Sequence, residues 1–112
     1  MPIRQPTLLP EGDRIAAIRH ADLVLVSQLE SVAQHEPWSL DLFADELANP
    51  VSTVDLYWCQ EQLAGFLCTW LIAGELQVQN LVTLPGMRRR GIAARLLAHA
   101  INRGQGEGLS SI

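Results

Sequence analysis

Residues 79–97 read QNLVTLPGMRRRGIAARLL, and they predict a β-strand, a Pro-Gly turn, a knot of arginines and then an amphipathic helix. The free backbone N–H groups at the start of such a helix, and the positive end of its dipole, both favour an anion. Gly91 and Ala93 leave room for that anion to reach the main chain. The stretch therefore predicts a phosphate-binding loop between a strand and a helix.

Two common phosphate loops are excluded by the residues around these glycines. A nucleotide P-loop has two glycines at the spacing of Gly86 and Gly91, followed by Lys and by Ser or Thr. Ile92 and Ala93 occupy those two positions, so the lysine and the Mg²⁺-binding hydroxyl are both missing. A dinucleotide fingerprint would lie between a strand and the following helix. The glycine-rich run 104–108 instead follows a helix and is expected to form its C-cap and a flexible turn.

Composition indicates one folded domain. The chain has 112 residues, of which 48% are hydrophobic and 18% charged, enough to bury a core and too apolar for disorder. We expect a loose, proline-containing leader over 1–13 and a single domain over 14–112. No segment is long and apolar enough to span a membrane, and no signal peptide is recognised, so the cytoplasm is the expected compartment. Cys59 and Cys68 are accordingly expected to be reduced thiols.

Positive charge is concentrated in one place. The formal net charge is −4, yet four of the eight basic residues, Arg88, Arg89, Arg90 and Arg95, fall within eight positions. A nucleic-acid-binding protein would spread basic charge over a face and interleave aromatic residues. Arginines are also unfavourable at a helix N-terminus unless an anion offsets them. The cluster therefore indicates a compact polyanion as ligand.

Hydrophobic periodicity predicts an alternation of strands and helices. A strand is expected over 14–20, followed by a helix that begins at 20–22 and has Leu25, Leu29 and Val32 on one face. Ser39 is the expected N-cap of a second helix. Further strands are expected over 52–59, 63–72 and 75–84, the second of them apolar on both faces and therefore central. A helix over 88–103 and the first residues of another strand at 109–112 complete the expected order.

The pattern Arg88-x-x-Gly91-x-Ala93 resembles the acetyl-CoA pyrophosphate loop of the GCN5-related N-acetyltransferases (GNAT superfamily). The order β-α-α-β-β-β-α-β is similar to the N-terminal portion of that α/β fold, with its mixed sheet. The run Glu36-Pro37-Trp38-Ser39 resembles the bacterial ribosomal-protein alanine N-acetyltransferases (RimI-type). Residues 80–85 also match the end of a strand in those enzymes, except that Leu84 replaces their usual Asp.

The resemblance implies acetyl-CoA as cosubstrate and assigns the residues that would hold it. The main chain of one strand would pair with the pantetheine arm, with an N–H facing the thioester oxygen, and a bulge in that strand would open the sheet. The loop and first helical turn would wrap the pyrophosphate, and Arg88 and the guanidiniums near it would supply positive charge. The implied cofactor-binding residues are Leu81, Val82, Thr83, Arg88, Arg89, Arg90, Gly91, Ile92, Ala93 and Ala94.

No catalytic residue is assigned within the chain. The family's general base and general acid lie beyond Ile112, so the domain is expected to be truncated, and Tyr57 falls in the wrong strand. The three histidines, His20, His35 and His99, are expected to be surface or helix residues without a catalytic partner. Glu36 and Glu75 are expected to be solvated. No cluster of Cys and His has the spacing of a metal site, so no metal is expected.

The resemblance also implies an acceptor, the N-terminal alanine amine of a ribosomal protein, with Pro37, Trp38 and Ser39 as candidate substrate residues. Trp38 could equally be a hydrophobic plug between two helices. Two alternatives stay open: a small-molecule amine acetyltransferase, and a non-catalytic acyl-CoA-binding module. Partners other than acetyl-CoA and the acceptor, such as nucleic acid or a membrane, are not expected. Self-association through an uncovered strand edge is expected, together with feeble catalysis.

Overall fold

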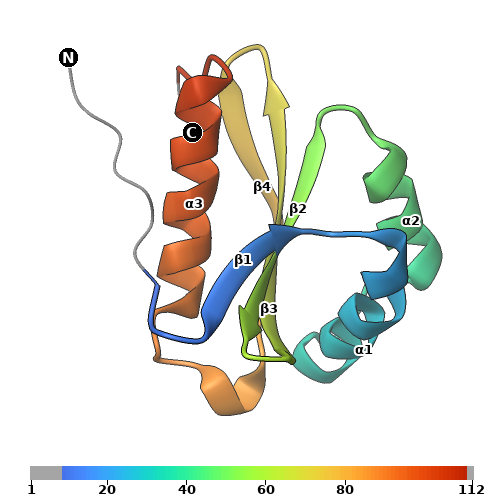
Figure 1. Cartoon of the computed structure of the whole chain (residues 1–112). Helices are drawn as coiled ribbons and strands as arrows, with labels where there is room; N and C mark the ends of the chain where they lie inside the picture. Colours follow the sequence, from blue (N-terminus) through green and yellow to red (C-terminus); the bar gives the residue numbers. More distant parts are fainter. Residues whose placement is uncertain (1–8, 111–112) are drawn as a thin grey trace.

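The computed structural model describes residues 9–110, which form one four-stranded antiparallel sheet with helices on both faces (Figure 1). The strand order is β1-β2-β3-β4, so neighbours in sequence are neighbours in the sheet. Helix α3 covers one face, and α1 and α2 cover the other. The elements are β1 (Asp13–Ala17), α1 (Leu23–Ala33), α2 (Leu40–Ala48), β2 (Ser52–Cys59), β3 (Gln62–Ile72), β4 (Glu75–Thr83) and α3 (Ile92–Gly106), with short 3₁₀ turns at His20–Asp22 and Pro85–Met87.

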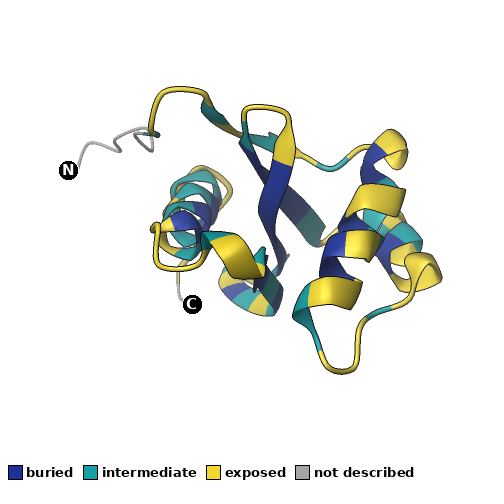
Figure 2. Cartoon of the chain, turned by 90° about the horizontal axis from the view of Figure 1, so that it is seen from below, coloured by how far each residue is buried: buried dark blue, intermediate teal, exposed yellow. Residues whose placement is uncertain are grey.

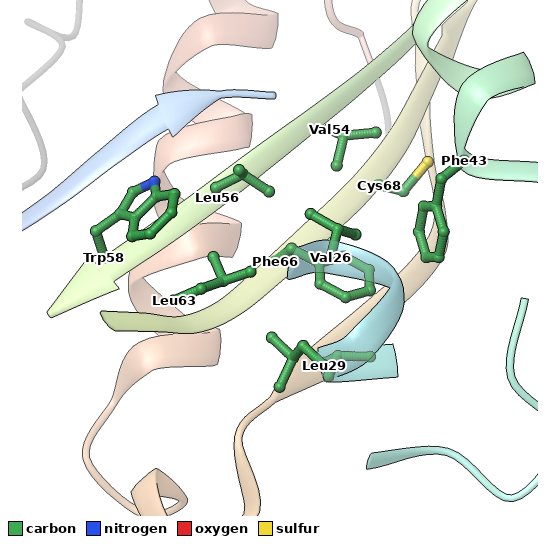
Figure 3. Close-up of a cluster of buried hydrophobic side chains, with 10 residues drawn as sticks. Val26, Leu29, Phe43, Val54, Leu56, Trp58, Leu63, Phe66 and Cys68 are labelled. Atoms are coloured by element: carbon green, nitrogen blue, oxygen red, sulfur yellow. The ribbon is translucent and has the colours of Figure 1, made fainter. Parts of the chain in front are cut away.

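The sheet separates two hydrophobic cores, and its inner strands are buried on both faces (Figure 2). On the α1/α2 face, Val26, Leu29 and Phe43 pack onto alternate side chains of β2 and β3, as Figure 3 shows. On the α3 face, Leu96 packs in a second core with side chains from the other face of β2 and β3, which include Tyr57 and Leu67. β3 contributes Phe66 to the first core and Leu67 to the second. The prediction of a central strand that is apolar on both faces is confirmed.

The buried face of α1 is rotated from the predicted one. Leu29 is buried as predicted, but the side chains of Leu25 and Val32 are 45% and 67% exposed. Val26 and Glu30 take their places in the buried stripe. The inward-facing positions 26, 29, 30 and 33 have helical spacing. Because position 30 is a glutamate, hydrophobicity alone did not identify this face of the helix as the buried one.

The ends of some elements also differ from the prediction, beginning with β1. β1 begins at Asp13 and ends at Ala17. The Ile18 N–H still donates to the opposed Val54 carbonyl at 2.9 Å, and the 3₁₀ turn begins at His20. Most of the expected leader lies outside the described residues. The Ala73-Gly74 turn between β3 and β4 has positive φ at both residues, +51° and +80°, as a tight type I′ hairpin requires.

Helix α3 runs to Gly106 and does not stop at Arg103. Gly104 lies inside the helix, and its carbonyl accepts hydrogen bonds from the N–H groups of Glu107 and Leu109 at 2.9 and 2.8 Å. Gly108, with φ of +94°, is the left-handed residue that follows the C-cap, so the helix ends within the run 104–108 that was expected to cap it. Residues 109–110 form no strand, and the rest of the predicted final strand lies outside the described residues.

Gly65 in β3 lets α3 and β4 approach each other closely. A Cβ at this position would lie 2.7 Å from the carbonyl oxygen of Val82 and 3.1 Å from a methyl group of Ile92. Only a residue without a side chain fits such a contact without displacing the main chain. Gly65 therefore sets the position of the α3 N-terminus relative to β4. None of the helices in residues 9–110 is long and apolar enough to cross a membrane.

Candidate functional site

Strand β4 is the edge of the sheet, and among the described residues it pairs only with β3. The N–H of Leu84 donates to the Ala64 carbonyl at 2.7 Å, which makes these two opposed residues a hydrogen-bonded pair. Such pairs alternate along an antiparallel ladder. The N–H groups of Leu81 and Thr83 therefore point away from β3, toward the open edge. Two main-chain donors are presented there in extended conformation.

A β-bulge interrupts β4 just before this segment. Cys68 is opposite Asn80, but Thr69, the next residue of β3, is opposite Val78, so Gln79 is the extra residue. The bulge reverses the phase of the side chains, because Leu76 packs on the α3 side while Val82 packs on the α1 side. The predicted strand over 75–84 is thus confirmed to Thr83, although its side chains do not alternate regularly between the two faces. The bulge implied for this strand by the family resemblance is present.

The loop after β4 turns the chain into the N-terminus of α3. Arg89 and Gly91 both have left-handed backbone conformations, with φ of +67° and +79°. Gly91 occupies the N-cap position, and no side chain caps the helix. The first intrahelical bond runs from the Arg95 N–H to the Gly91 carbonyl at 3.0 Å. The N–H groups of residues 92–94 therefore have no partner within the helix, as an anion site at a helix N-terminus requires.

The four clustered arginines play two different parts. Arg88, Arg89 and Arg90 are exposed, and their guanidinium groups form no ion pair or hydrogen bond with any described side chain or main-chain group. Arg95 instead turns inward, and its NH1 donates to the Arg90 carbonyl at 2.7 Å and to the Tyr57 hydroxyl at 3.4 Å. Three guanidiniums are therefore available for an anion, whereas the fourth braces the loop.

Tyr57 links this brace to β1. Its hydroxyl donates to Asp13 Oδ2 at 2.5 Å while accepting from Arg95. Burial, together with the bond to Asp13, raises the pKa of Tyr57 to about 12, so the phenol stays protonated near neutrality. The side chain is a fixed structural link between β1, β2 and α3, and it lies away from the free edge of β4.

A cavity of about 520 Å³ joins the open edge of β4 to the N-terminus of α3. Nine of the ten predicted cofactor-binding residues line it, and Arg90 alone does not. Two lining residues, Ala33 and Gln34, come from the end of α1 and were missed by sequence reasoning. Their place in the site could not be predicted, because small and polar residues at a helix C-terminus do not by themselves indicate a ligand-binding site. One end of the cavity, the arginine-rich end, is lined by Arg88 and Arg89, and the other, the α1 end, is lined by Ala33 and Gln34.

The α1 end of the cavity is fixed by a buried polar network. The Gln34 side-chain amide donates to Asn80 Oδ1 at 3.0 Å, and Asn80 Nδ2 donates to both carboxylate oxygens of Glu30 at 3.1 and 3.0 Å. The backbone N–H of Trp38 donates to the same carboxylate at 2.9 Å. The network thus joins α1, the bulge of β4 and the loop that leads to α2.

The three candidate substrate residues lie in that loop but do not line the cavity. Pro37 is exposed. Trp38 is half-buried, with its ring centroid 5.3 Å from that of Phe43, so packing accounts for its side chain. Ser39 caps α2, since its hydroxyl accepts from the Leu42 N–H at 3.2 Å. The predicted capping role of Ser39 is confirmed.

The histidines and the two glutamates considered in the sequence do not line the cavity. His20, His35, Glu36 and Glu75 are exposed, as expected. His99 does have a partner, because its Nε2 lies 3.8 Å from the buried carboxylate of Asp55, which also accepts from Arg103 at 2.6 Å. Within residues 9–110 no group of three or more His, Cys, Asp or Glu side chains could hold a metal ion.

Both cysteines are free thiols. Burial raises the pKa of Cys59, and it raises that of Cys68 to about 12. Cys68 belongs to a second buried carboxylate site, where Glu46 Oε1 accepts from Ser52 at 2.8 Å, from Cys68 at 3.4 Å and from Trp70 Nε1 at 2.6 Å. Neither thiol has the depressed pKa of a nucleophile.

Several solved structures that superpose on this chain are acetyltransferases. The ribosomal-protein-S18-alanine N-acetyltransferase of Escherichia coli superposes with a TM-score of 0.80 at 23% identity, covering 88% of this chain and 63% of that enzyme. PaiA N-acetyltransferase of Thermoplasma acidophilum, in complex with coenzyme A, gives 0.78 at 16%, covering 87% and 74%. Naa50 of Arabidopsis thaliana, in complex with the bisubstrate analogue CoA-Ac-MVNAL, gives 0.69 at 19%, covering 82% and 64%.

These likenesses establish the fold, and the chain spans about two thirds of the length of the enzymes that share it. None of the curated proteins compared with the chain matches it. The sequence model of the Acetyltransferase (GNAT) family matches residues 19–112, which include the whole of the loop and helix described above. The chain therefore belongs to the GNAT family of acetyltransferases.

Proposed function

We propose that this chain binds acetyl-CoA in the 520 Å³ cavity and belongs to an N-acetyltransferase. The observation that carries the proposal is the match between the two ends of the cavity and the two parts of that ligand. One end has free helix N–H groups and exposed arginines, which suit a pyrophosphate. The other runs along the N–H groups of Leu81 and Thr83, which suit the amide carbonyls of a pantetheine arm.

The backbone carries most of this recognition, which explains why most of the side chains that line the cavity are small or apolar. Ala93, Ala94 and Gly91 leave the main chain accessible to a phosphate. Arg88 and Arg89 add positive charge at the cavity wall. On a chain of net charge −4, this local positive field would also steer the polyanionic cosubstrate to its site.

The reaction at this site is transfer of an acetyl group from sulfur to nitrogen. The neutral amine attacks the thioester carbonyl, and the C–N bond forms while the C–S bond breaks. The ammonium proton is lost, and the departing thiolate takes up a proton to give coenzyme A. An outward N–H of β4 would stabilise the negative charge that develops on the carbonyl oxygen. Holding both reactants in one channel supplies the orientation that a bimolecular reaction lacks.

For the acceptor we propose the N-terminal alanine of a ribosomal protein, with the cytoplasm as the compartment. Support comes from the Pro37-Trp38-Ser39 loop, which resembles that of the RimI-type enzymes and leaves α1 at the end of the cavity lined by Gln34. One structural neighbour acts on ribosomal-protein-S18 alanine, and another holds a bisubstrate analogue built on a peptide. Both neighbours support a peptide α-amine, while other structural neighbours are aminoglycoside acetyltransferases and support the alternative of a small-molecule amine.

A non-catalytic acyl-CoA-binding module is the second candidate, and one observation favours it. None of the described residues that line the cavity carries a carboxylate, imidazole, phenol or thiol. General acid–base help contributes typically ~10²–10⁴-fold to a rate, so catalysis by the described residues alone would be slow. Binding and turnover must therefore be measured separately.

The test is calorimetry with acetyl-CoA and CoA, followed by an assay of thiol release with a panel of acceptors. We expect saturable binding of both ligands, and slow turnover that prefers peptides beginning with alanine over aminoglycosides and polyamines. Absence of binding would overturn the proposal. Turnover with aminoglycosides or polyamines alone would reassign the acceptor to a small amine, and tight binding without turnover would favour the non-catalytic module.

A further inference from the structure

Glu30 is a buried carboxylate whose partners are all N–H groups. Its side chain belongs to a residue only 1% exposed, and it accepts from Asn80 Nδ2 and from the Trp38 N–H. Among residues 9–110 no Arg or His forms an ion pair with it. Charged groups are rarely buried in this way, because desolvation is costly unless hydrogen bonds replace the lost water. Such a side chain marks a place where two parts of the chain are held in one arrangement.

The two parts that Glu30 joins lie on either side of the acyl end of the cavity. Asn80 follows the bulged residue Gln79 and precedes Leu81, whose N–H faces the open edge. Trp38 belongs to the loop over 34–39 between α1 and α2. Gln34 closes the circuit, because it lines the cavity and donates to Asn80 at 3.0 Å. Any movement of the loop relative to β4 must therefore break a buried hydrogen bond.

We propose that Glu30 is a positioning residue that holds the 34–39 loop against the acyl end of the cavity, so that occupancy of the cavity is coupled to the loop. The proposal rests on the proposed function, since it takes the α1 end of the cavity as the place where thioester and acceptor meet. Gln34 transmits the coupling, because a ligand that fills the cavity restrains its side chain and hence Asn80 and Glu30.

The polarity of the Glu30–Asn80 contact allows an exchange of roles between the two side chains. Asn80→Asp removes the N–H donor and places a second carboxyl group opposite Glu30. Where both groups are ionised, no rotation of either restores a hydrogen bond, so exchange is compared with the wild type over a range of pH that separates this state from one in which the two groups share a proton. The double variant Glu30→Gln with Asn80→Asp reverses donor and acceptor. The new amide at position 30 can then donate to position 80 and accept from Trp38, while position 80 still accepts from Gln34. The matched control is Glu46→Gln, which alters the other buried glutamate on the same face of the sheet, away from the loop.

The experiment measures amide hydrogen exchange at Trp38 with and without acetyl-CoA, and CoA affinity by calorimetry, in folded protein. In ligand-free Asn80→Asp we expect exchange at Trp38 about five-fold or more faster than in the wild type, because repulsion displaces the Glu30 carboxylate that accepts from the Trp38 N–H. The double variant should return to within about two-fold of the wild-type rate. Acetyl-CoA should slow exchange at Trp38 in the wild type and the double variant but not in Asn80→Asp. CoA affinity, most of which comes from the arginine-rich end, should fall in Asn80→Asp by no more than the factor by which the ligand slows exchange at Trp38 in the wild type.

Three results would overturn the proposal. The first is wild-type exchange at Trp38 in Asn80→Asp. The second is a folded double variant that does not recover. The third is an equal acceleration at Trp38 in Glu46→Gln, which would show loss of stability without any specific role for Glu30. If Asn80→Asp does not fold, the double variant and the Glu46→Gln control still decide between these outcomes. Failure of the wild type to bind acetyl-CoA would instead contradict the proposed function, while ligand-free exchange would still test the hold of Glu30 on the loop.

Discussion

Replacing Gly91 by Val tests the loop at its most constrained residue. Gly91 has φ of +79° and ψ of +13°, a left-handed conformation that costs an L-residue about 1–2 kcal/mol and a β-branched residue more. Space is not the obstacle, because a Cβ at this position would lie 3.4 Å from the Arg95 guanidinium, an ordinary contact with a flexible group. The loop must therefore change its backbone angles, which turns the N–H groups at the start of α3 away from the anion.

The assay is calorimetric titration with CoA, because free CoA reports on binding without any chemistry. A backbone cost of about 1.4 kcal/mol or more corresponds to a ten-fold weaker affinity. We therefore expect Gly91→Val to bind CoA at least ten-fold more weakly while α3 stays folded by circular dichroism. Gly91→Asn should lose only a few-fold, since Asn tolerates the left-handed region. Gly86→Ala is the matched control in the same loop, because a Cβ there meets open space.

Two outcomes would refute this reasoning. If Gly91→Val bound CoA as tightly as the wild type, the left-handed turn would have no part in ligand binding. If Gly86→Ala weakened binding as much as Gly91→Val, the effect would reflect general disturbance of the loop rather than the backbone angles of one residue.

Three further predictions follow from the geometry. Gly65→Ala should lower the free energy of unfolding by about 1–3 kcal/mol in urea titrations, because its Cβ would lie 2.7 Å from the Val82 carbonyl; an unchanged midpoint would contradict that close contact. Arg95→Ala should weaken CoA binding about five-fold by freeing the Arg90 carbonyl, with no change expected if Arg95 plays no part in bracing the loop. The Cys68 thiol, whose pKa burial raises to about 12, should resist thiol reagents at pH 8 until the protein unfolds; its contribution to stability is complete below the pKa of the unfolded thiol and is lost as the pH rises toward 12.

The turn from β4 into the N-terminus of α3 could be predicted from sequence because its determinants are local. Gly91, Ala93 and the arginines lie within a few residues of one another, so the pattern that they form can be recognised directly in the sequence. The central position of β3 was legible for a similar reason, since a strand that is apolar on both faces must be covered on both. Local chemistry and local periodicity carried these predictions.

The features that were missed depend on contacts between distant residues. The face of α1 was placed wrongly because Glu30 occupies a buried position, which hydrogen bonds from Asn80, fifty residues later, and from the Trp38 N–H make tolerable. The inward turn of Arg95 depends on Tyr57 in another strand. The continuation of α3 to Gly106 depends on Leu109 folding back onto Gly104. In each case a tertiary contact overrode the preference of the local sequence.

The central claim is that main-chain N–H groups along β4 and at the start of α3 form one ligand site. An amide-resolved NMR titration of the isotope-labelled chain with CoA tests it most directly. We expect saturable shifts concentrated at the N–H groups of Leu81, Thr83 and residues 91–94, with a single dissociation constant. No shifts in these amides, or shifts confined to a different part of the chain, would contradict the account.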